Sequence, residues 1–247
     1  MNLKKLKGTG VALVTPFHKD GSIDFRSLEK VVSHVIKGQA EYLVVLGTTG
    51  ESVTISKDEK AAILDLVCDV NNKRVPVVLG VGGNNTQEIL NQFSFFDFAK
   101  VDAVLSVSPY YNKPSQRGII QHFKLVAGTC PVPVILYNVP SRTGSNMTAE
   151  TTLALANEVE NVIGIKEASG NMEQVMQIIS SKPKDFLVIS GDDAITLPLM
   201  ACGADGVISV VANAYPKAFS EMVRLCLANR FDKARALHYQ FIRFKSD

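Results

Sequence analysis

Two patterns of hydrophobic and polar residues alternate along the chain. Short, continuously apolar runs such as YLVVLG, residues 42–47, are typical of strands that are buried on both faces of a parallel sheet. Between these runs, apolar residues return every three or four positions, as in residues 22–38, which predicts amphipathic helices. Eight such strand–helix units follow one another at a spacing of roughly 25–30 residues, as a (β/α)₈ barrel requires.

The predicted units can be given as ranges. The expected strands are 9–17, 42–47, 75–82, 102–109, 132–140, 161–169, 186–193 and 205–213, and the expected helices are 22–38, 56–70, 86–100, 115–128, 148–159, 171–182, 194–204 and 215–230. Asp24 is expected to cap the first helix and Gly38 to end it. Ser56 and Glu59 have the spacing of a capping box at the start of the second helix.

An α/β fold, a (β/α)₈ TIM barrel with a truncated C-terminal helical extension, is therefore the expected architecture. A doubly wound open sheet is the alternative, but it predicts a glycine-rich phosphate loop after the first strand, and TPFHKDGS at 15–22 is not one. We expect residues 1–230 to form the catalytic barrel and residues 231–247 to begin a C-terminal helical region. That region stops abruptly, so a longer native chain is expected.

Composition narrows the possible partners. Of the 247 residues, 46% are hydrophobic and 20% charged, and the net charge of +2 comes without a basic block, which gives no electrostatic footprint for nucleic acid. We expect no signal peptide and no membrane span. The four cysteines and four histidines are scattered along the chain, so we expect free thiols in a reducing, cytoplasmic compartment and no metal site.

In a TIM barrel, chemistry takes place at the carboxyl-terminal ends of the strands. The expected strand ends carry GTTGES, SPYYNKP, YNVPSRTG, KEASG, SGDD and SVVAN. Hydroxyls, phenols, one arginine and one lysine are therefore expected to converge on one mouth of the barrel.

Lys166 ends the apolar run 162–165 and precedes Glu167. A lysine buried among apolar side chains is costly unless it is paired or neutral. One explanation is a salt bridge at the barrel rim to Glu167, although successive strand residues point to opposite faces. The other is an amine nucleophile: desolvation lowers the pKa of lysine, and the neutral amine can form a Schiff base with a carbonyl. The position favours the nucleophile.

The other polar residues at the mouth have two interpretations each. Tyr137 is a core aromatic or a proton shuttle, and Tyr110 and Tyr111 share that ambiguity because adjacent residues cannot both point one way. Thr48 and Thr49 cap a turn or present hydroxyls and amides to a carboxylate. Arg142 is a solvated loop charge or a bidentate carboxylate ligand. Asp192 and Asp193 are better explained by capping of the next helix than by a metal.

Taken together, GTTGES, SPYYNKPSQ, YNVPSRTG, GIKEASG, SGDD and GVISVVAN resemble the motifs of the dihydrodipicolinate synthases. These enzymes belong to the pyruvate-dependent class I aldolases, which also include N-acetylneuraminate lyase. The resemblance runs from about residue 6 to the end of the chain. It implies condensation of pyruvate with aspartate semialdehyde, in the diaminopimelate route to lysine, by a homotetramer that is a dimer of dimers and needs no cofactor.

The resemblance also implies residue roles. Lys166 would form the Schiff base, and Tyr137, Thr48 and Tyr111 would form a proton relay, with Tyr111 reaching into the site of a neighbouring subunit. Thr49 would bind the pyruvate carboxylate and Arg142 that of the semialdehyde, while Gly191 and Ile208 would shape the pyruvate pocket. A lysine feedback site at a subunit interface would include Ser52, Asn84, Glu88 and Tyr110. Lys57 and Lys60 stand where some relatives carry histidines, and these cations disfavour a second cationic ligand.

Three other functions remain open from the sequence. N-acetylneuraminate lyase and keto-sugar-acid lyases share the Schiff base, but the sialic-acid enzyme has an apolar residue at the place of Arg142, so the arginine favours a short acidic acceptor. A metal-dependent pyruvate aldolase would be inhibited by chelators and would give no trapped imine. A non-catalytic binding barrel would be expected to have lost Lys166 or Tyr137, and both are present.

Overall fold

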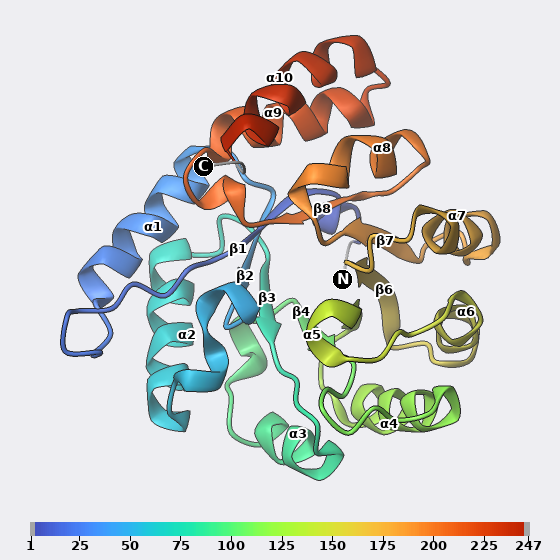
Figure 1. The fold of residues 1–247 in the computed structure, drawn as a ribbon. Coiled ribbons are helices and arrows are strands. Elements are labelled where there is room, and N and C mark those ends of the chain that lie inside the picture. Colours follow the sequence, from blue (N-terminus) through green and yellow to red (C-terminus); the bar gives the residue numbers. More distant parts are fainter. Residues whose placement is uncertain (1–2, 245–247) are drawn as a thin grey trace.

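The structure is a computed structural model that describes residues 3–244. Eight parallel strands form a closed barrel in the order β1 to β8, with β1 paired to β8, and the helices surround it (Figure 1). The predicted (β/α)₈ barrel is thus confirmed, and the open-sheet alternative is wrong.

The elements have the following bounds. The strands are β1 (Gly8–Ala12), β2 (Tyr42–Val45), β3 (Val77–Gly80), β4 (Ala103–Val107), β5 (Val134–Asn138), β6 (Val162–Glu167), β7 (Leu187–Ser190) and β8 (Gly206–Ser209). The helices are α1 (Phe25–Lys37), α2 (Lys57–Asn71), α3 (Thr86–Phe93), α4 (Gln116–Thr129), α5 (Pro140–Thr143), α6 (Ala149–Glu158), α7 (Met172–Ser181), α8 (Thr196–Ala201), α9 (Pro216–Leu227) and α10 (Phe231–Phe244).

The predicted helix caps are confirmed. The Asp24 side chain accepts a hydrogen bond from the Ser27 amide at the start of α1, and Gly38 caps its end. At α2, Ser56 and Glu59 form a reciprocal capping box. The two N-terminal caps, Asp24 and Ser56, satisfy backbone N–H groups that the first helical turn leaves without partners, which contributes about 1 kcal/mol each.

The structure departs from the predicted ranges in three ways. The helix expected at 86–100 ends at Phe93, because Asp97 caps a separate 3₁₀ turn, Phe98–Lys100, and Phe96 turns back to bury its ring. The short helix α5 follows β5 where no helix was predicted; Pro140 supplies its first residue and Gly144 ends it in the left-handed conformation. The strands are shorter than the apolar runs because the chain leaves the sheet at the carboxyl end and its apolar residues then pack in the loops.

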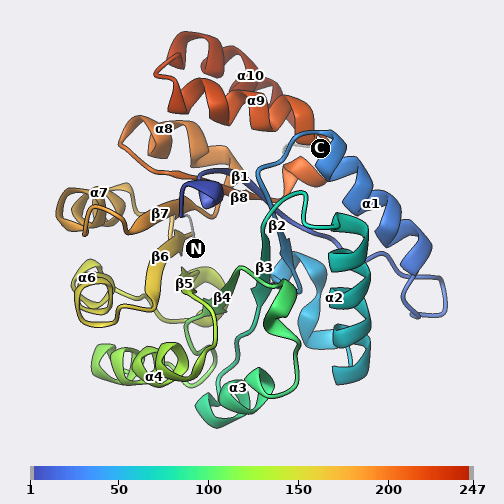
Figure 2. The same ribbon diagram turned by 180° about the vertical axis from the view of Figure 1, so that it is seen from behind.

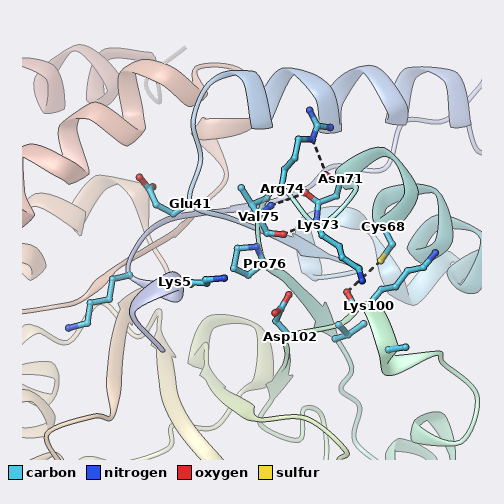
Figure 3. Close-up of a pocket in the computed structure, with 13 residues that line it drawn as sticks. Lys5, Glu41, Cys68, Asn71, Lys73, Arg74, Val75, Pro76, Lys100 and Asp102 are labelled. Atoms are coloured by element: carbon cyan, nitrogen blue, oxygen red, sulfur yellow. Dashed lines mark hydrogen bonds between the residues drawn. The ribbon is translucent and has the colours of Figure 1, made fainter. Parts of the chain in front are cut away.

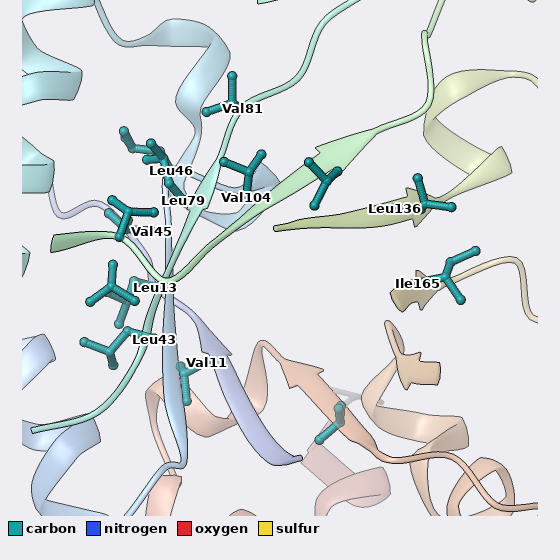
Figure 4. Close-up of a cluster of buried hydrophobic side chains, with 14 of the residues drawn as sticks. Val11, Leu13, Leu43, Val45, Leu46, Leu79, Val81, Val104, Leu136 and Ile165 are labelled. Atoms are coloured by element: carbon teal, nitrogen blue, oxygen red, sulfur yellow. The ribbon is translucent and has the colours of Figure 1, made fainter. Parts of the chain in front are cut away.

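Side-chain alternation divides the core into two layers. Residues that point outward from the strands, including Leu136 and Ile165, pack beneath the helices (Figure 4). Residues that point inward, including Tyr42 and Tyr137, fill the barrel. Leu6, from the 3₁₀ turn Leu3–Leu6, belongs to the inner layer, and Figure 2 shows this turn in dark blue over the ring of strands. Leu6 therefore helps to fill the amino-terminal end of the barrel interior.

Helix α10 packs on α9 and α8 outside the barrel, with the rings of Phe219 and Phe241 5.1 Å apart. It begins at the place where the sequence predicted a C-terminal helical region. In the part of the chain that the structure describes, no helix combines the length and the apolar character needed to cross a membrane.

Candidate active site

A cavity of about 450 Å³ opens at the carboxyl-terminal ends of β2 to β5. Among the predicted catalytic and substrate-binding residues, Thr48, Tyr137 and Arg142 line it. Thr49, Lys166, Gly191 and Ile208 do not line this cavity. They lie at or near the ends of β2, β6, β7 and β8, on the same mouth of the barrel.

Lys166 lies next to this cavity, beneath Tyr137. The two residues are paired in the register of β5 and β6, and the Lys166 Nζ lies 4.3 Å from the centroid of the Tyr137 ring. Lys166 is only 6% exposed. Within residues 3–244, no carboxylate forms a salt bridge with it. Burial lowers the pKa of Lys166 to about 8; the negative charge of Asp193 opposes this change, and the positive charge of Arg142 adds to it.

Glu167 points to the opposite face of β6 and is not the partner of Lys166. Its carboxylate accepts hydrogen bonds from the Asn138 and Gln174 side-chain amides and from the Ser169 backbone amide. The alternative of a Lys166–Glu167 salt bridge is therefore wrong, for the reason that strand alternation supplies.

Tyr137 is as buried as Lys166, with 6% of its surface exposed. Burial raises the pKa of its hydroxyl, while hydrogen bonding with the Thr48 side chain and the charge of Arg142 act in the opposite direction. The hydroxyl therefore stays protonated near neutral pH and is available as a proton donor that can recover its proton.

The loop after β2 is held in a strained conformation. Leu46 has a φ of 57°, in the left-handed region, and leads into the 3₁₀ turn Thr48–Gly50. A Cβ atom at Gly80 would lie 2.3 Å from the Leu46 carbonyl oxygen, so only glycine permits this approach. The Thr15 hydroxyl donates to the Gly50 carbonyl over 2.8 Å. Thr48 and Thr49 are thereby fixed at the mouth.

Gly191 lies against the stem of Lys166. A Cβ atom at Gly191 would lie 2.6 Å from the Ala168 Cβ and 3.1 Å from the Lys166 Cε, so a larger residue would displace the lysine. Ile208 is 1% exposed in the inner layer of the barrel.

Arg142 and the two adjacent tyrosines lie farther out. Arg142 is exposed on α5 at the rim of the cavity. Tyr110 lines the cavity, whereas Tyr111 is 86% exposed and has a φ of 70°. The tyrosines therefore point in different directions, as expected of adjacent residues.

Only two of the four residues predicted for a lysine-binding site line the cavity. Ser52 and Tyr110 line the cavity together with Lys60, whose pKa is lowered by burial. Asn84 and Glu88 do not line it; they lie at the amino-terminal end of α3, where the Asn84 carbonyl accepts from the Asn112 side chain. Lys57 lies over the ring of Phe95, with its Nζ 4.1 Å from the centroid.

The acids after β7 have structural partners. Asp192 caps the 3₁₀ turn Asp193–Ile195 by accepting from the Ala194 amide, which confirms the capping interpretation. One Asp193 oxygen accepts from the Val210 and Val211 amides, and the other is buried and has no hydrogen-bond partner among the described residues. No three His, Cys, Asp or Glu side chains within residues 3–244 are grouped so that they could hold a metal ion.

A second cavity, of about 570 Å³, lies at the opposite end of the barrel (Figure 3). It is lined by residues that precede the strands, including Lys5, Glu41, Pro76 and Asp102. Both carboxylates are already engaged: Glu41 accepts from the Thr9 amide and Arg224, and Asp102 accepts from the Val77 amide. None of the predicted catalytic residues lines this cavity.

Sequence reasoning missed the influence of Asp193 on Lys166 and the polar side chains behind β5 and β6. The position of these residues in the sequence could have indicated the cluster. Asn138 and Glu167 each follow a residue that points into the barrel, so both had to face outward beneath the helices. A carboxylate buried there requires donors, and the neighbouring elements supply them.

Comparison with known proteins agrees with this arrangement. Residues 5–246 match the model of the Dihydrodipicolinate synthetase family. The chain is 59% identical over 235 residues to the 4-hydroxy-tetrahydrodipicolinate synthase of Flavobacterium psychrophilum, covering 95% of this chain and 80% of the relative. It is 55% identical over 236 residues to the enzyme of the same name from Parabacteroides distasonis, covering 96% of this chain and 80% of the relative.

The fold comparison points the same way. The chloride-inhibited dihydrodipicolinate synthase from Acinetobacter baumannii, solved in complex with pyruvate, superposes with a TM-score of 0.93 at 40% identity, covering 96% of this chain and 81% of that one. The chain therefore belongs to the dihydrodipicolinate synthetase family and is an enzyme of that family, a lyase of lysine and diaminopimelate biosynthesis.

Proposed function

We propose that the chain condenses pyruvate with aspartate semialdehyde through a Schiff base on Lys166 and yields 4-hydroxy-tetrahydrodipicolinate. The observation that carries this proposal is the position of the Lys166 amine: it is buried, free of carboxylate pairing among the described residues, and 4.3 Å from the Tyr137 ring centroid. Family membership supports the same reaction.

The proposed chemistry begins with the neutral amine of Lys166. It attacks the C2 carbonyl carbon of pyruvate to give a carbinolamine, which loses water to form an iminium ion. The iminium withdraws electrons from C3, which loses a proton and becomes an enamine. The enamine carbon then attacks the aldehyde carbon of the semialdehyde. The amino group of the new adduct displaces Lys166 from C2, which closes the ring and restores the lysine.

Several of these steps move protons at one place. Tyr137 can give a proton to the departing hydroxyl of the carbinolamine and recover it through Thr48, which interacts with its hydroxyl. Asp193 supplies negative charge close to the developing iminium. The reaction needs no metal or organic cofactor, because the iminium itself withdraws the electrons.

A direct test uses pyruvate and borohydride. Reduction should convert the iminium into a stable secondary amine, and intact-mass and peptide analysis should find it on Lys166. A coupled assay with aspartate semialdehyde should show turnover that resists a chelator. If wild-type protein yields no adduct, the Schiff-base proposal is wrong.

The activity should depend on pH through Lys166. Only the neutral amine attacks, and the pKa of Lys166 is about 8, so roughly a tenth of the sites are competent at pH 7. We expect kcat/KM for pyruvate to rise about tenfold per pH unit below that pKa and to level off above it. A profile that is flat between about pH 6 and 9 would contradict this assignment.

Arg142→Ala should spare pyruvate binding and damage use of the second substrate. Arg142 lies on the rim, farther out than Lys166, where an acidic acceptor would arrive after the Schiff base forms. Losing a charge-assisted hydrogen bond costs about 1.5–3 kcal/mol, or roughly 10- to 150-fold in kcat/KM for the semialdehyde. Steady-state kinetics and borohydride trapping on the same variant measure both effects.

Arg142→Lys is the matched control, because it keeps the charge but loses the two-pronged geometry, and it should recover only part of the loss. If trapping fails while KM for the semialdehyde is unaltered, Arg142 serves pyruvate or the fold, and the preference for an acidic acceptor over a sugar aldehyde loses its main support.

Assembly and location belong to the same proposal. The 86% exposure of Tyr111 beside the mouth supports a role in a neighbouring subunit, and thus the homotetramer. A cytoplasmic location fits the four free cysteines. Feedback by lysine at Ser52, Asn84, Glu88 and Tyr110 stays a prediction.

A further inference from the structure

Four buried or half-buried polar side chains form a cluster on the outer face of β5 and β6. We name Asn138, Asn146, Glu167 and Gln174 the amide–carboxylate cluster. They come from β5, the loop after α5, β6 and α7, and Figure 2 shows β5, β6 and α7 on the same side of the barrel. Asn138 is fully buried and Glu167 is 1% exposed.

Glu167 is the acceptor at the centre of this cluster. The Asn138 Nδ2 lies 3.2 and 3.1 Å from its two carboxylate oxygens, the Gln174 Nε2 lies 3.0 Å from one, and the Ser169 backbone nitrogen lies 2.8 Å from the other. Within residues 3–244, no salt bridge to Glu167 exists. Neutral donors alone therefore solvate a buried carboxylate, and each bond to it is stronger than a neutral pair.

The same amides hold the loop that carries Arg142. The Asn138 Oδ1 accepts from the Met147 backbone nitrogen over 3.0 Å, and the Gln174 Nε2 donates to the Met147 carbonyl over 3.2 Å. The Asn146 Nδ2 donates to the Gln174 Oε1 over 2.7 Å. Residues 139–147 form the segment that includes α5 and Arg142. These hydrogen bonds hold the far end of that segment, at Asn146 and Met147, against the end of β5 and the start of α7.

The strand register connects this cluster to the chemistry. Tyr137 is paired with Lys166, and one position later Asn138 is paired with Glu167. Tyr137 and Lys166, which point into the barrel, would take part in the reaction. Asn138 and Glu167, which point outward, form side-chain hydrogen bonds across the same two strands. The carbonyl of Asn138 accepts from the Ala168 amide and that of Glu167 from the Gly191 amide, so the two residues also take part in the last backbone bonds at the strand ends.

We propose that Glu167 and Asn138 are positioning residues: their hydrogen bonds hold Lys166, Tyr137 and the Arg142 loop in one fixed arrangement. This inference rests on the proposed Schiff-base function. Its physical basis is that misplacement of reacting groups by about 1 Å can cost roughly a hundredfold in rate, while side chains packed on one face of a strand pair fix the opposite face as well.

Glu167→Gln tests this role with almost no change in volume. One oxygen becomes an NH₂ group that faces the Asn138 and Gln174 donors. Asn138 can turn its amide around to accept from it, but Asn138 then loses the bond from the Met147 nitrogen. We expect kcat to fall roughly 10- to 100-fold and KM for the semialdehyde to rise. Measurements well below the unfolding temperature separate these effects from a loss of folded protein.

A double variant that combines Asn138→Asp with Glu167→Gln exchanges acceptor and donor across the two strands. The carboxylate introduced at position 138 can accept from both the new side-chain amide at position 167 and the Met147 nitrogen, so at least half of the loss in kcat, on a logarithmic scale, should be recovered. Glu173→Gln, which alters an exposed carboxylate in the first turn of α7, is the matched control and should keep wild-type kcat. Gln174→Met removes one donor and provides a milder test if Glu167→Gln does not fold.

The outcomes are distinguishable. If Glu167→Gln folds and its kcat lies within twofold of wild type, the positioning role is wrong. It is also wrong if the double variant recovers nothing, or if Gln174→Met folds with wild-type kcat when Glu167→Gln does not fold. These results leave the Schiff base intact as long as wild type still traps pyruvate. Failure of wild type to trap pyruvate would instead overturn the proposed function.

Discussion

Lys166→Ala is expected to form no borohydride-trapped adduct with pyruvate and to show no measurable turnover. The variant removes the amine that lies 4.3 Å from the centroid of the Tyr137 ring. Without covalent attachment, the pyruvate methyl group has no iminium to withdraw its electrons, so the carbon nucleophile does not form. Intact mass after reduction and a coupled assay measure the two losses.

Lys166→Met separates chemistry from folding. It keeps most of the side-chain volume and removes the cost of burying an ammonium group, so the unfolding temperature should stay level or rise. Lys184→Ala, which alters an exposed lysine before β7, should behave as wild type. Activity of Lys166→Ala within about tenfold of wild type, a barrier change of only about 1.4 kcal/mol, would overturn the nucleophile assignment.

Tyr137→Phe should slow turnover by roughly two to three orders of magnitude, which is the scale of lost general acid–base catalysis. The ring stays, so its packing over Lys166 and in the inner core layer should survive. The hydroxyl that interacts with Thr48 is lost. Stopped-flow or quench measurement of adduct formation should show that formation of the iminium itself becomes slow.

Tyr239→Phe removes a hydroxyl from a tyrosine that is 58% exposed on α10, and it should leave kcat unchanged. If Tyr137→Phe also keeps its kcat, then Tyr137 is a core aromatic whose hydroxyl serves no proton transfer, which was the alternative interpretation of this residue.

The architecture was predictable because it depends on local patterns that repeat. Continuous apolar runs and three- to four-residue spacing identify buried strands and amphipathic helices without knowledge of the partners. The structure differs from the predicted elements where capping side chains and tertiary contacts outweighed the local hydrophobic pattern. Asp97 begins a new turn in a sequence that otherwise suits a continuous helix, and Pro140 with Gly144 forms a single helical turn too short to have a period.

The candidate site was predictable in its membership but not in its geometry. The rule that chemistry lies at strand ends directed attention to Lys166, Tyr137 and Arg142. The register that pairs Tyr137 with Lys166 depends on how two distant segments align, and the alignment includes an irregularity near Val134. Strand alternation predicted that Glu167 faces away from Lys166, but its pairing with Asn138 was missed because a polar residue next to a strand end also suits a loop.

The pairing of the first strand with the last determines when the barrel is completed. Gly8 is paired with Gly206, and the Asn213 side chain donates to the Ala12 carbonyl over 2.7 Å and accepts from the Val14 amide over 3.2 Å. At a synthesis rate of about 5–20 residues per second, these partners leave the ribosome roughly 10–40 s apart. During that time β1 presents an unpaired edge, which favours aggregation, so the nascent chain should depend on chaperones most strongly until β8 emerges.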